Sequence, residues 1–152
     1  MANVERYRYG DPCKIPMPVE SATVIEIGDN VAIVSDYLVP LSSIADAGDA
    51  AANREAGADA FVGVAASASK NGDTDDVLVI TDGVVMMNQK TAAAIGIGDP
   101  VGPYASADAC EDQTVVEDST SPIAVCVKTH DDTTTETLVK LMPNKIFGTP
   151  NS

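Results

Sequence analysis

The chain has 152 residues, of which 9 are basic and 23 acidic, so its formal net charge at pH 7 is −14. This length suits a single domain, and an acidic chain without a basic stripe excludes nucleic acids and anionic membranes as expected partners. Trp is absent and other aromatic residues are few, so the core must be built from aliphatic side chains.

Residues 1–20 are predicted to form an extended N-terminal arm. Pro12, Pro16 and Pro18 forbid a helix and remove backbone donors. The apolar residues between these prolines favour an arm laid against a partner over a disordered one. Removal of residues 1–20 is therefore expected to leave a folded domain. The N-terminus also lacks the apolar stretch of a signal peptide, which predicts synthesis in a reducing cytoplasm.

A single β-rich domain is predicted over residues 21–142. The β-branched segments 23–27 and 31–34 flank Gly28-Asp29-Asn30, a combination that predicts a hairpin. A short strand is expected at residues 37–41. The alanine-rich segment 45–57 predicts a helix, for which Gly57 is a suitable C-terminal cap.

The remainder of the domain is predicted to be strands and turns. A turn at Asn71-Gly72 separates two strands, and Asp82-Gly83 between two apolar runs predicts a second hairpin. Residues 89–95 suit one helical turn. Residues 143–152 form a proline-bounded C-terminal tail. The expected strands are 61–66, 77–81, 84–87, 101–105, 114–117, 122–128 and 137–142.

The chain also contains an internal repeat. Residues 62–65 recur as 123–126, and residues 77–80 recur as 138–141, both 61 positions later. A Gly-Asp turn precedes each copy, at Gly28-Asp29 and Gly98-Asp99. The sequence therefore predicts an all-β fold, sandwich-like or barrel-like, with two similar units at about 24–88 and 95–142. The segment containing the helix is an insertion in the first unit.

No segment predicts an active site. His130 is the one histidine, it is flanked by two aspartates in a turn, and no nucleophile-elbow sequence accompanies it. Gly96-Ile97-Gly98 lacks the third glycine of a dinucleotide-binding loop, because Val101 stands there, and no phosphate-loop lysine follows. Cys126 alternates with valines on a predicted strand and suits a small buried residue. We expect no enzymatic activity, no cofactor and no metal.

Two acidic turns leave calcium binding open as an alternative. They contain Asp73, Asp75 and Asp76 in the first unit, and Asp131, Asp132 and Glu136 in the second. Oxygen-rich turns suit a hard cation, but the spacing of an EF-hand is missing. Solvated turns that oppose aggregation explain the same residues.

The order of these motifs resembles the capsid cement, or decoration, proteins of tailed bacteriophages. The matching stretches cover most of the chain after residue 24, although Ala124 stands where such proteins often have glycine. These stretches are residues 28–31, 61–68, 77–85, 97–104, 123–127 and 137–141.

The resemblance implies a virion protein on the outer surface of an icosahedral head. It implies a homotrimer that binds the major capsid protein and links neighbouring subunits, after synthesis in the host cytoplasm. The candidate contact residues are apolar side chains in the two predicted arms, which would be ordered on docking. They are Tyr7, Tyr9, Ile15, Ile146 and Phe147.

Two other classes of protein remain as alternatives. A carbohydrate- or polymer-binding β-module would present exposed aromatic platforms, and the absence of Trp counts against it. A small trimeric β-enzyme, such as a nucleotide hydrolase, would need bound divalent metal and a basic phosphate site. Binding to polysaccharide, or a change in melting temperature with magnesium and nucleotide, would distinguish these classes.

Overall fold

A computed structural model describes residues 7–142, with side chains from residue 14 onward. The described residues form an all-β fold with one α-helix, which confirms the predicted class. The elements are β1 (Tyr7–Met17), β2 (Asn30–Val34), β3 (Tyr37–Pro40), a 3₁₀ turn (Leu41–Ser43), α1 (Ala50–Ala60), β4 (Phe61–Ala65), β5 (Val77–Gln89), β6 (Pro100–Ala105), β7 (Cys110–Glu117), β8 (Ala124–Cys126) and β9 (Glu136–Leu141).

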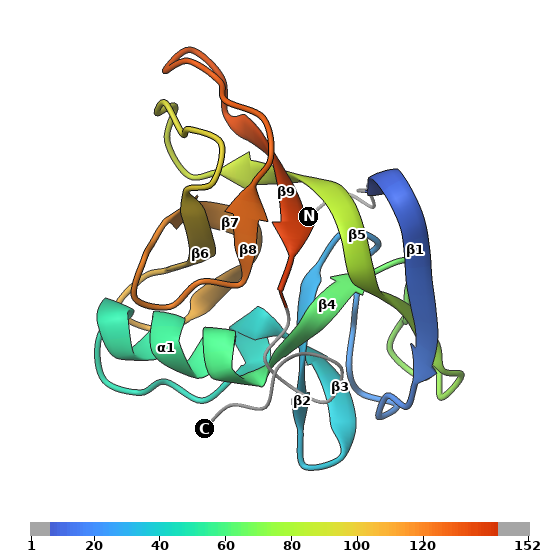
Figure 1. The fold of residues 1–152 in the computed structure, drawn as a ribbon. Coiled ribbons are helices and arrows are strands. Elements are labelled where there is room, and N and C mark those ends of the chain that lie inside the picture. Colours follow the sequence, from blue (N-terminus) through green and yellow to red (C-terminus); the bar gives the residue numbers. More distant parts are fainter. Residues whose placement is uncertain (1–6, 143–152) are drawn as a thin grey trace.

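The strands form two small barrels that share the long strand β5 (Figure 1). In the second barrel, β5, β7, β6, β8 and β9 pair in a closed ring. In the first barrel the strands follow the order β1, β5, β4, β2 and β3, and Leu38 N–H donates to the Pro18 carbonyl at 2.8 Å to join the two ends. Closure leaves few strand edges free for unwanted pairing.

The predicted N-terminal arm is largely a strand of the domain. Its backbone is extended, as expected, and β1 pairs with β5 of the same chain. Met17 and Val19 are each only 4% exposed and belong to the core. The prolines are compatible with this position because, along most of its length, β1 has a neighbouring strand on one side and none on the other. A missing backbone N–H donor is tolerated on the side that faces no strand.

The two predicted hairpin turns have other roles. Residues 23–27 are not a strand, and only Ile25 forms a bridge, to Ser69. The hairpin between β2 and β3 instead turns at Ser35 and Asp36, which both have positive φ. Such a turn matches the twist of the strands, but Ser-Asp is a weaker sequence signal than Asn-Gly or Asp-Gly.

The Asp82-Gly83 pair lies inside β5, which continues without a turn from the first barrel into the second. Gly83 has φ +124°, and the pairing of β1 with β5 changes register between Tyr9 and Lys14, opposite this position. The glycine accommodates an irregularity in a continuous strand, where the sequence predicted a chain reversal. Residues 90–94 likewise form no helical turn.

The internal repeat is visible first in the hydrogen bonds of the two Gly-Asp turns. The Asp29 carboxylate accepts the Glu26 N–H at 2.9 Å, and the Asp99 carboxylate accepts the Gly96 N–H at 2.9 Å. The backbone N–H of each aspartate donates back to the carbonyl of the same partner at 3.1 Å. Each turn is thus an aspartate-stabilised loop that leads into a strand, β2 or β6.

The strands that follow these turns are also equivalent. Gly28 N–H donates to the Ala65 carbonyl at 2.9 Å, and Gly98 N–H donates to the Cys126 carbonyl at 2.8 Å. Ala65 and Cys126 are 61 residues apart, as the sequence predicted for this strand. The trio β2, β4 and β5 in the first barrel therefore corresponds to β6, β8 and β9 in the second.

The offset changes to 60 at the last strand of each unit. Ala65 pairs with Val79, and Cys126 pairs with Val139, so Val139 is the equivalent of Val79. The loop after β8 is one residue shorter than the loop after β4. The sequence predicted an offset of 61 at this strand too, and this prediction is wrong by one residue. The offset of 60 aligns the Leu-Val pair at 78–79 with the identical pair at 138–139.

The strand β5 ends the first unit and begins the second. Ile15 of β1 pairs with Val79, and Val85 of β5 pairs with Val139 in the same arrangement. The units therefore begin with β1 and with the second half of β5, ahead of the predicted starts at residues 24 and 95. The two barrels therefore share one continuous strand and cannot separate without breaking it.

Equivalent positions fill the two cores. The first barrel encloses Met17, Ile25 and Val31, and the second encloses Met87, Ile95 and Val101, all at most 4% exposed. Each such side chain stabilises the fold by about 1.5–3 kcal/mol when fully buried. Cys126, which is 1% exposed, is a buried residue as predicted.

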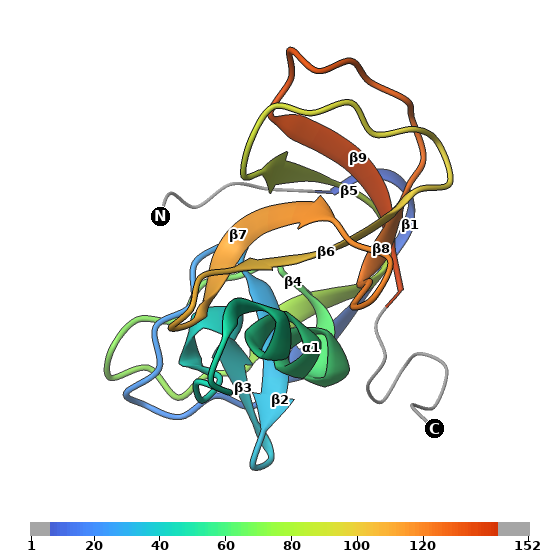
Figure 2. The same ribbon diagram turned by 90° about the vertical axis from the view of Figure 1, so that its left-hand side faces the viewer.

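The helix α1 belongs to the first unit but packs on β6 and β7 of the second (Figure 2). It begins after Asp49, whose carboxylate caps the Ala52 N–H at 2.8 Å. Gly57 lies inside the helix, where a Cβ would come within 2.9 Å of Cys110 Sγ, so close packing explains this glycine better than the predicted cap. Buried Asn53 donates to the carbonyls of Ser106 and Ala107.

A buried carboxylate also joins the two units. Asp29 is 4% exposed, and its second oxygen accepts a hydrogen bond from Gln113 of β7 at 2.8 Å. Burial raises the pKa of Asp29 above its ordinary value, and the nearby carboxylates of Asp112 and Glu26 raise it further. Hydrogen bonds from Glu26 N–H and Gln113 only partly oppose this shift. The charged form is thus disfavoured in the folded state.

The pKa of Asp29 predicts how Asp29→Asn changes stability with pH. A carboxyl whose pKa is raised by folding destabilises the fold at pH values above that pKa, and the cost disappears on protonation. We expect the stability of the wild type relative to Asp29→Asn to rise as the pH falls from 7 to 4. Urea unfolding of both proteins across this pH range measures the difference in their free energies of unfolding. The contributions of other titrating groups are largely the same in both proteins and cancel in this difference. A difference independent of pH would contradict the prediction.

Candidate functional site

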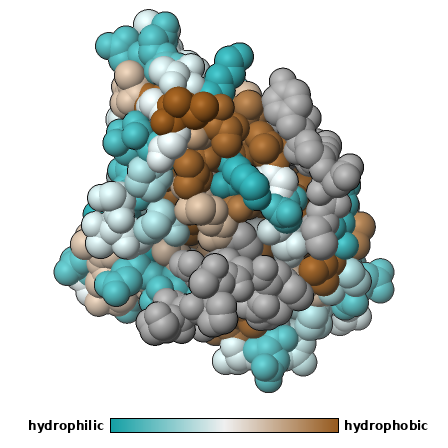
Figure 3. Space-filling view, in the orientation of Figure 1, coloured by the Kyte–Doolittle hydropathy of each residue, from teal (hydrophilic) through white to brown (hydrophobic). Residues whose placement is uncertain are grey.

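The candidate site is the outer face of the second barrel, on β5, β8 and β9. Residues that point into this barrel alternate with outward residues along each strand. The outward apolar residues are half-buried and lie in two adjacent rows across the sheet. We call this surface the apolar face, and its members are Val84, Met86, Val125, Val127 and Leu138. Figure 3 shows apolar surface over β5 and β9, interrupted by hydrophilic atoms.

Lys140 lies within the apolar face, between Val84 and Val125. Its ammonium group donates to Asp82 Oδ1 at 2.9 Å, and this hydrogen bond lowers the pKa of Asp82. Both side chains are largely exposed, so the pair contributes little to stability. It does keep the one charge in the centre of the face paired.

The corresponding face of the first barrel is buried inside the chain. Val64 is the equivalent of Val125 and is 1% exposed, and Ile80 is the equivalent of Lys140 and is 0% exposed. Both belong to the cluster that contains Ala124 of the second barrel. One copy of this face is thus an internal packing surface, whereas the other copy is uncovered by residues 7–142.

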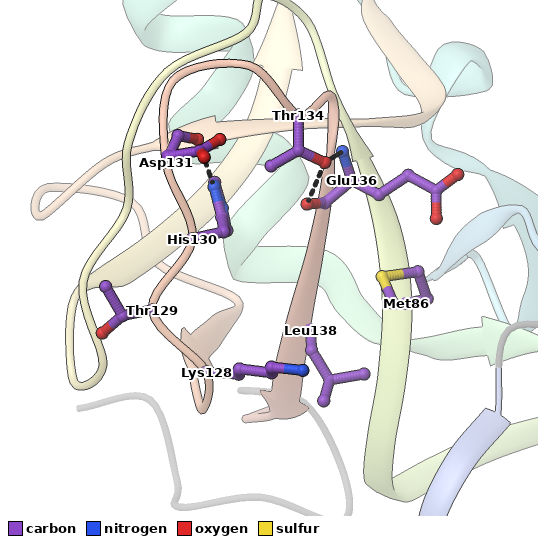
Figure 4. Close-up of a pocket in the computed structure, with 8 residues that line it drawn as sticks. All are labelled: Met86, Lys128, Thr129, His130, Asp131, Thr134, Glu136 and Leu138. Carbon is purple, nitrogen blue, oxygen red and sulfur yellow. Dashed lines mark hydrogen bonds between the residues drawn. The ribbon is translucent and has the colours of Figure 1, made fainter.

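A hollow of about 450 Å³ borders the apolar face (Figure 4). Met86 and Leu138 stand on the neighbouring strands β5 and β9, where they pair directly. The loop 127–135 forms the opposite side. The hollow thus combines an apolar base with a polar rim, and its other lining residues are Lys128, Thr129, His130, Asp131, Thr134 and Glu136.

Two of the hydrogen bonds that hold this loop involve His130. His130 N–H donates to the Ile95 carbonyl at 3.1 Å, and the His130 ring places Nδ1 3.0 Å from the Asp131 carbonyl. Because a carbonyl only accepts, Nδ1 must carry a hydrogen. The ring therefore contacts a backbone carbonyl of its own loop. The contacts assign His130 a role in shaping the loop.

The rim of the hollow is acidic. Asp131 and Glu136 are exposed lining residues, Asp132 is exposed next to them, and Lys128 is the one lysine or arginine in the lining. The hydroxyl and then the backbone N–H of Thr133 hydrogen-bond to Asp131 and lower its pKa. Asp131 consequently stays charged in mildly acidic solution.

Ile97 extends this surface beyond the hollow. Its side chain is 70% exposed, the largest exposure among the large hydrophobic residues that the structure describes. Its backbone N–H donates to Thr129 Oγ1 at 2.9 Å, which places it beside the rim. The equivalent residue of the first unit, Ile27, is half-buried. A single exposed isoleucine is common on protein surfaces, so Ile97 is relevant only together with the apolar residues of the hollow nearby.

The acidic turns do not gather into a metal site in the described part of the chain. Within residues 7–142 no group of three His, Cys, Asp or Glu side chains is arranged to hold an ion. Residues 73, 75 and 76 are exposed, as are residues 131, 132 and 136.

The five predicted contact residues do not gather in one place that the structure describes. Tyr7 and Tyr9 lie on β1, where their backbones pair with Val85 and Val84, next to the apolar face. Ile15 is half-buried and packs against the core of the first barrel, so it is partly a core residue. Two of the predictions fall outside the described residues, Ile146 and Phe147.

Sequence reasoning missed the residues that make up the candidate site. The predicted strands 84–87 and 137–142 contain Met86 and Leu138, but the side of the sheet that these residues occupy depends on a barrel closure that the sequence does not reveal. The sequence predicts for Ile97 only a place in a glycine-rich turn. Its signal was the repeat itself, because an isoleucine recurs in this turn at position 27.

No protein-family model matches the chain, and a search of curated proteins finds no match either. Among the described residues, no helix has the length and apolar character needed to cross a membrane.

Proposed function

We propose that this chain is a non-enzymatic structural protein that binds the outer surface of an icosahedral phage head and links neighbouring major capsid subunits. The motif order that resembles capsid decoration proteins is the origin of this proposal. The observation that supports it most strongly is the apolar face of the second barrel, a partly exposed surface on a closed ring of strands. Its equivalent in the first barrel already serves as a packing surface.

The physical character of the surface supports attachment to a basic protein lattice. The chain carries a formal charge of −14, and the rim beside the apolar face is acidic. Such a surface is repelled by nucleic acid and attracted by basic patches. If the protein forms the proposed homotrimer, three weak contacts act together and raise the effective concentration at each site.

The proposal predicts that the protein is a stoichiometric component of assembled particles. Particles purified on a density gradient should contain the chain at a fixed ratio to the major capsid protein, as measured by quantitative mass spectrometry. Heads that lack it should release DNA at a lower temperature and recover on its addition. A protein that is missing from particles but is retained on polysaccharide would favour the alternative of a polymer-binding β-module.

A further inference from the structure

We propose that the hollow beside Met86 and Leu138, together with Ile97, receives a partner segment that presents an aliphatic side chain next to an arginine. This inference rests on the proposed function, because it describes the partner surface that the attachment site would recognise. We define the partner segment only by the chemical character of these two side chains.

The apolar part of the occupant follows from the base and the edge of the hollow. Met86 and Leu138 are half-buried neighbours on β5 and β9, and Ile97 is 70% exposed beside Thr129. An aliphatic side chain in the hollow would remove Met86 and Leu138 from water, and a second apolar group of the same segment would cover Ile97. Burial of such area is the main favourable term in protein association.

The cationic part follows from the charges on the rim. Asp131 and Glu136 line the hollow and Asp132 is exposed next to them, so three carboxylates face the single ammonium group of Lys128. Lys140 is already paired with Asp82. The guanidinium group of arginine offers several donors to carboxylates, and its methylene stem can lie on an apolar surface. A partner with acidic residues at this position would be repelled.

The same charges argue against a second copy of the chain as the occupant of this face. Two copies that met through it would bring both acidic rims together, on molecules that each carry a charge of −14. The proposed homotrimer therefore uses other surfaces. Concentration-dependent self-association that is lost on changing Ile97 would overturn this part of the proposal.

The first test uses the whole chain and two short peptides. Acetyl-Leu-Arg-Leu-amide should shift the NMR signals of Met86, Ile97 and Leu138, with a Kd of about 1 mM, as small ligands of this size allow. Acetyl-Leu-Glu-Leu-amide should bind at least about tenfold more weakly. Equal binding of both peptides, or shifts confined to other residues, would overturn the proposal.

Two variants and a matched control make the test specific. Ile97→Ser removes an exposed apolar group, and Glu136→Gln removes one rim charge, so both proteins should stay folded. Each should weaken binding of the arginine peptide, Ile97→Ser by about tenfold. Val24→Ser is the control, because Val24 is 52% exposed in the segment between β1 and β2. It should bind like the wild type, and an equal loss in all three would contradict the proposal.

Binding to heads separates this inference from the proposed function. If the wild type binds heads and Ile97→Ser binds them equally well, the docking face is wrong while the function stands. If the wild type does not bind heads but the arginine peptide still binds at Ile97, the proposed function fails and the docking face stands.

Discussion

Deletion of residues 1–20 should unfold the first barrel. The deletion removes Met17 and Val19 from the core and exposes the edge of β5 along the residues that pair with β1. Burial of each such side chain is worth about 1.5–3 kcal/mol, and a domain is stable by only about 5–15 kcal/mol in total. The loss of the strand and its pairing should therefore leave no cooperative thermal transition by circular dichroism.

The structure thus leads to the opposite expectation from the sequence, which predicted that the truncated domain stays folded. Two substitutions serve as controls within the same segment. Met17→Ala should destabilise the full chain by about 2–5 kcal/mol, whereas Lys14→Ser, at an exposed position, should change stability by less than about 0.5 kcal/mol. A truncated protein that melts cooperatively near the temperature of the full chain would show that β1 is dispensable.

Gly63→Ala should destabilise the protein by at least about 3 kcal/mol. Gly63 lies in β4 with φ +157°, and a Cβ there would collide with the backbone carbonyl of Ile80 and with the Val79 side chain. A backbone atom in the centre of a sheet cannot move aside as a flexible side chain can. Urea denaturation with both proteins at equal concentration gives the difference in the free energy of unfolding.

Gly48→Ala is the matched control for this prediction. Gly48 also has positive φ, at +112°, but a Cβ there would meet nothing within 4 Å. Only backbone strain remains, worth about 1–2 kcal/mol. The equivalent of Gly63 in the second unit is Ala124, where a Cβ is already accommodated. Equal losses for the two substitutions would show that crowding against β5 is unimportant.

The sequence predicted the class of the fold and the order of most strands because alternation of apolar residues is a local property. Strands β3, β4, β6 and β9 lie close to their predicted positions. The turns were less predictable. Asp82-Gly83 has the composition of a hairpin turn, yet β1 and β9 pair with β5 on either side of it and keep the strand continuous.

The candidate site was predictable only in part, for a different physical reason. Whether an outward strand residue is covered depends on which surfaces pack together, and this is a long-range property. Val64 and Val125 occupy equivalent positions and have the same side chain, but Val64 is buried and Val125 is only half-buried. Composition and periodicity cannot distinguish them, whereas the arrangement of the two barrels does.

Co-sedimentation of the purified full-length protein with heads that lack it tests the proposed structural role most directly. The amount bound should rise with protein concentration and saturate at a fixed ratio to the major capsid protein, and an excess of unlabelled protein should displace a labelled sample. Binding that never saturates, or no binding by a protein shown to be folded, would contradict the role proposed for this chain.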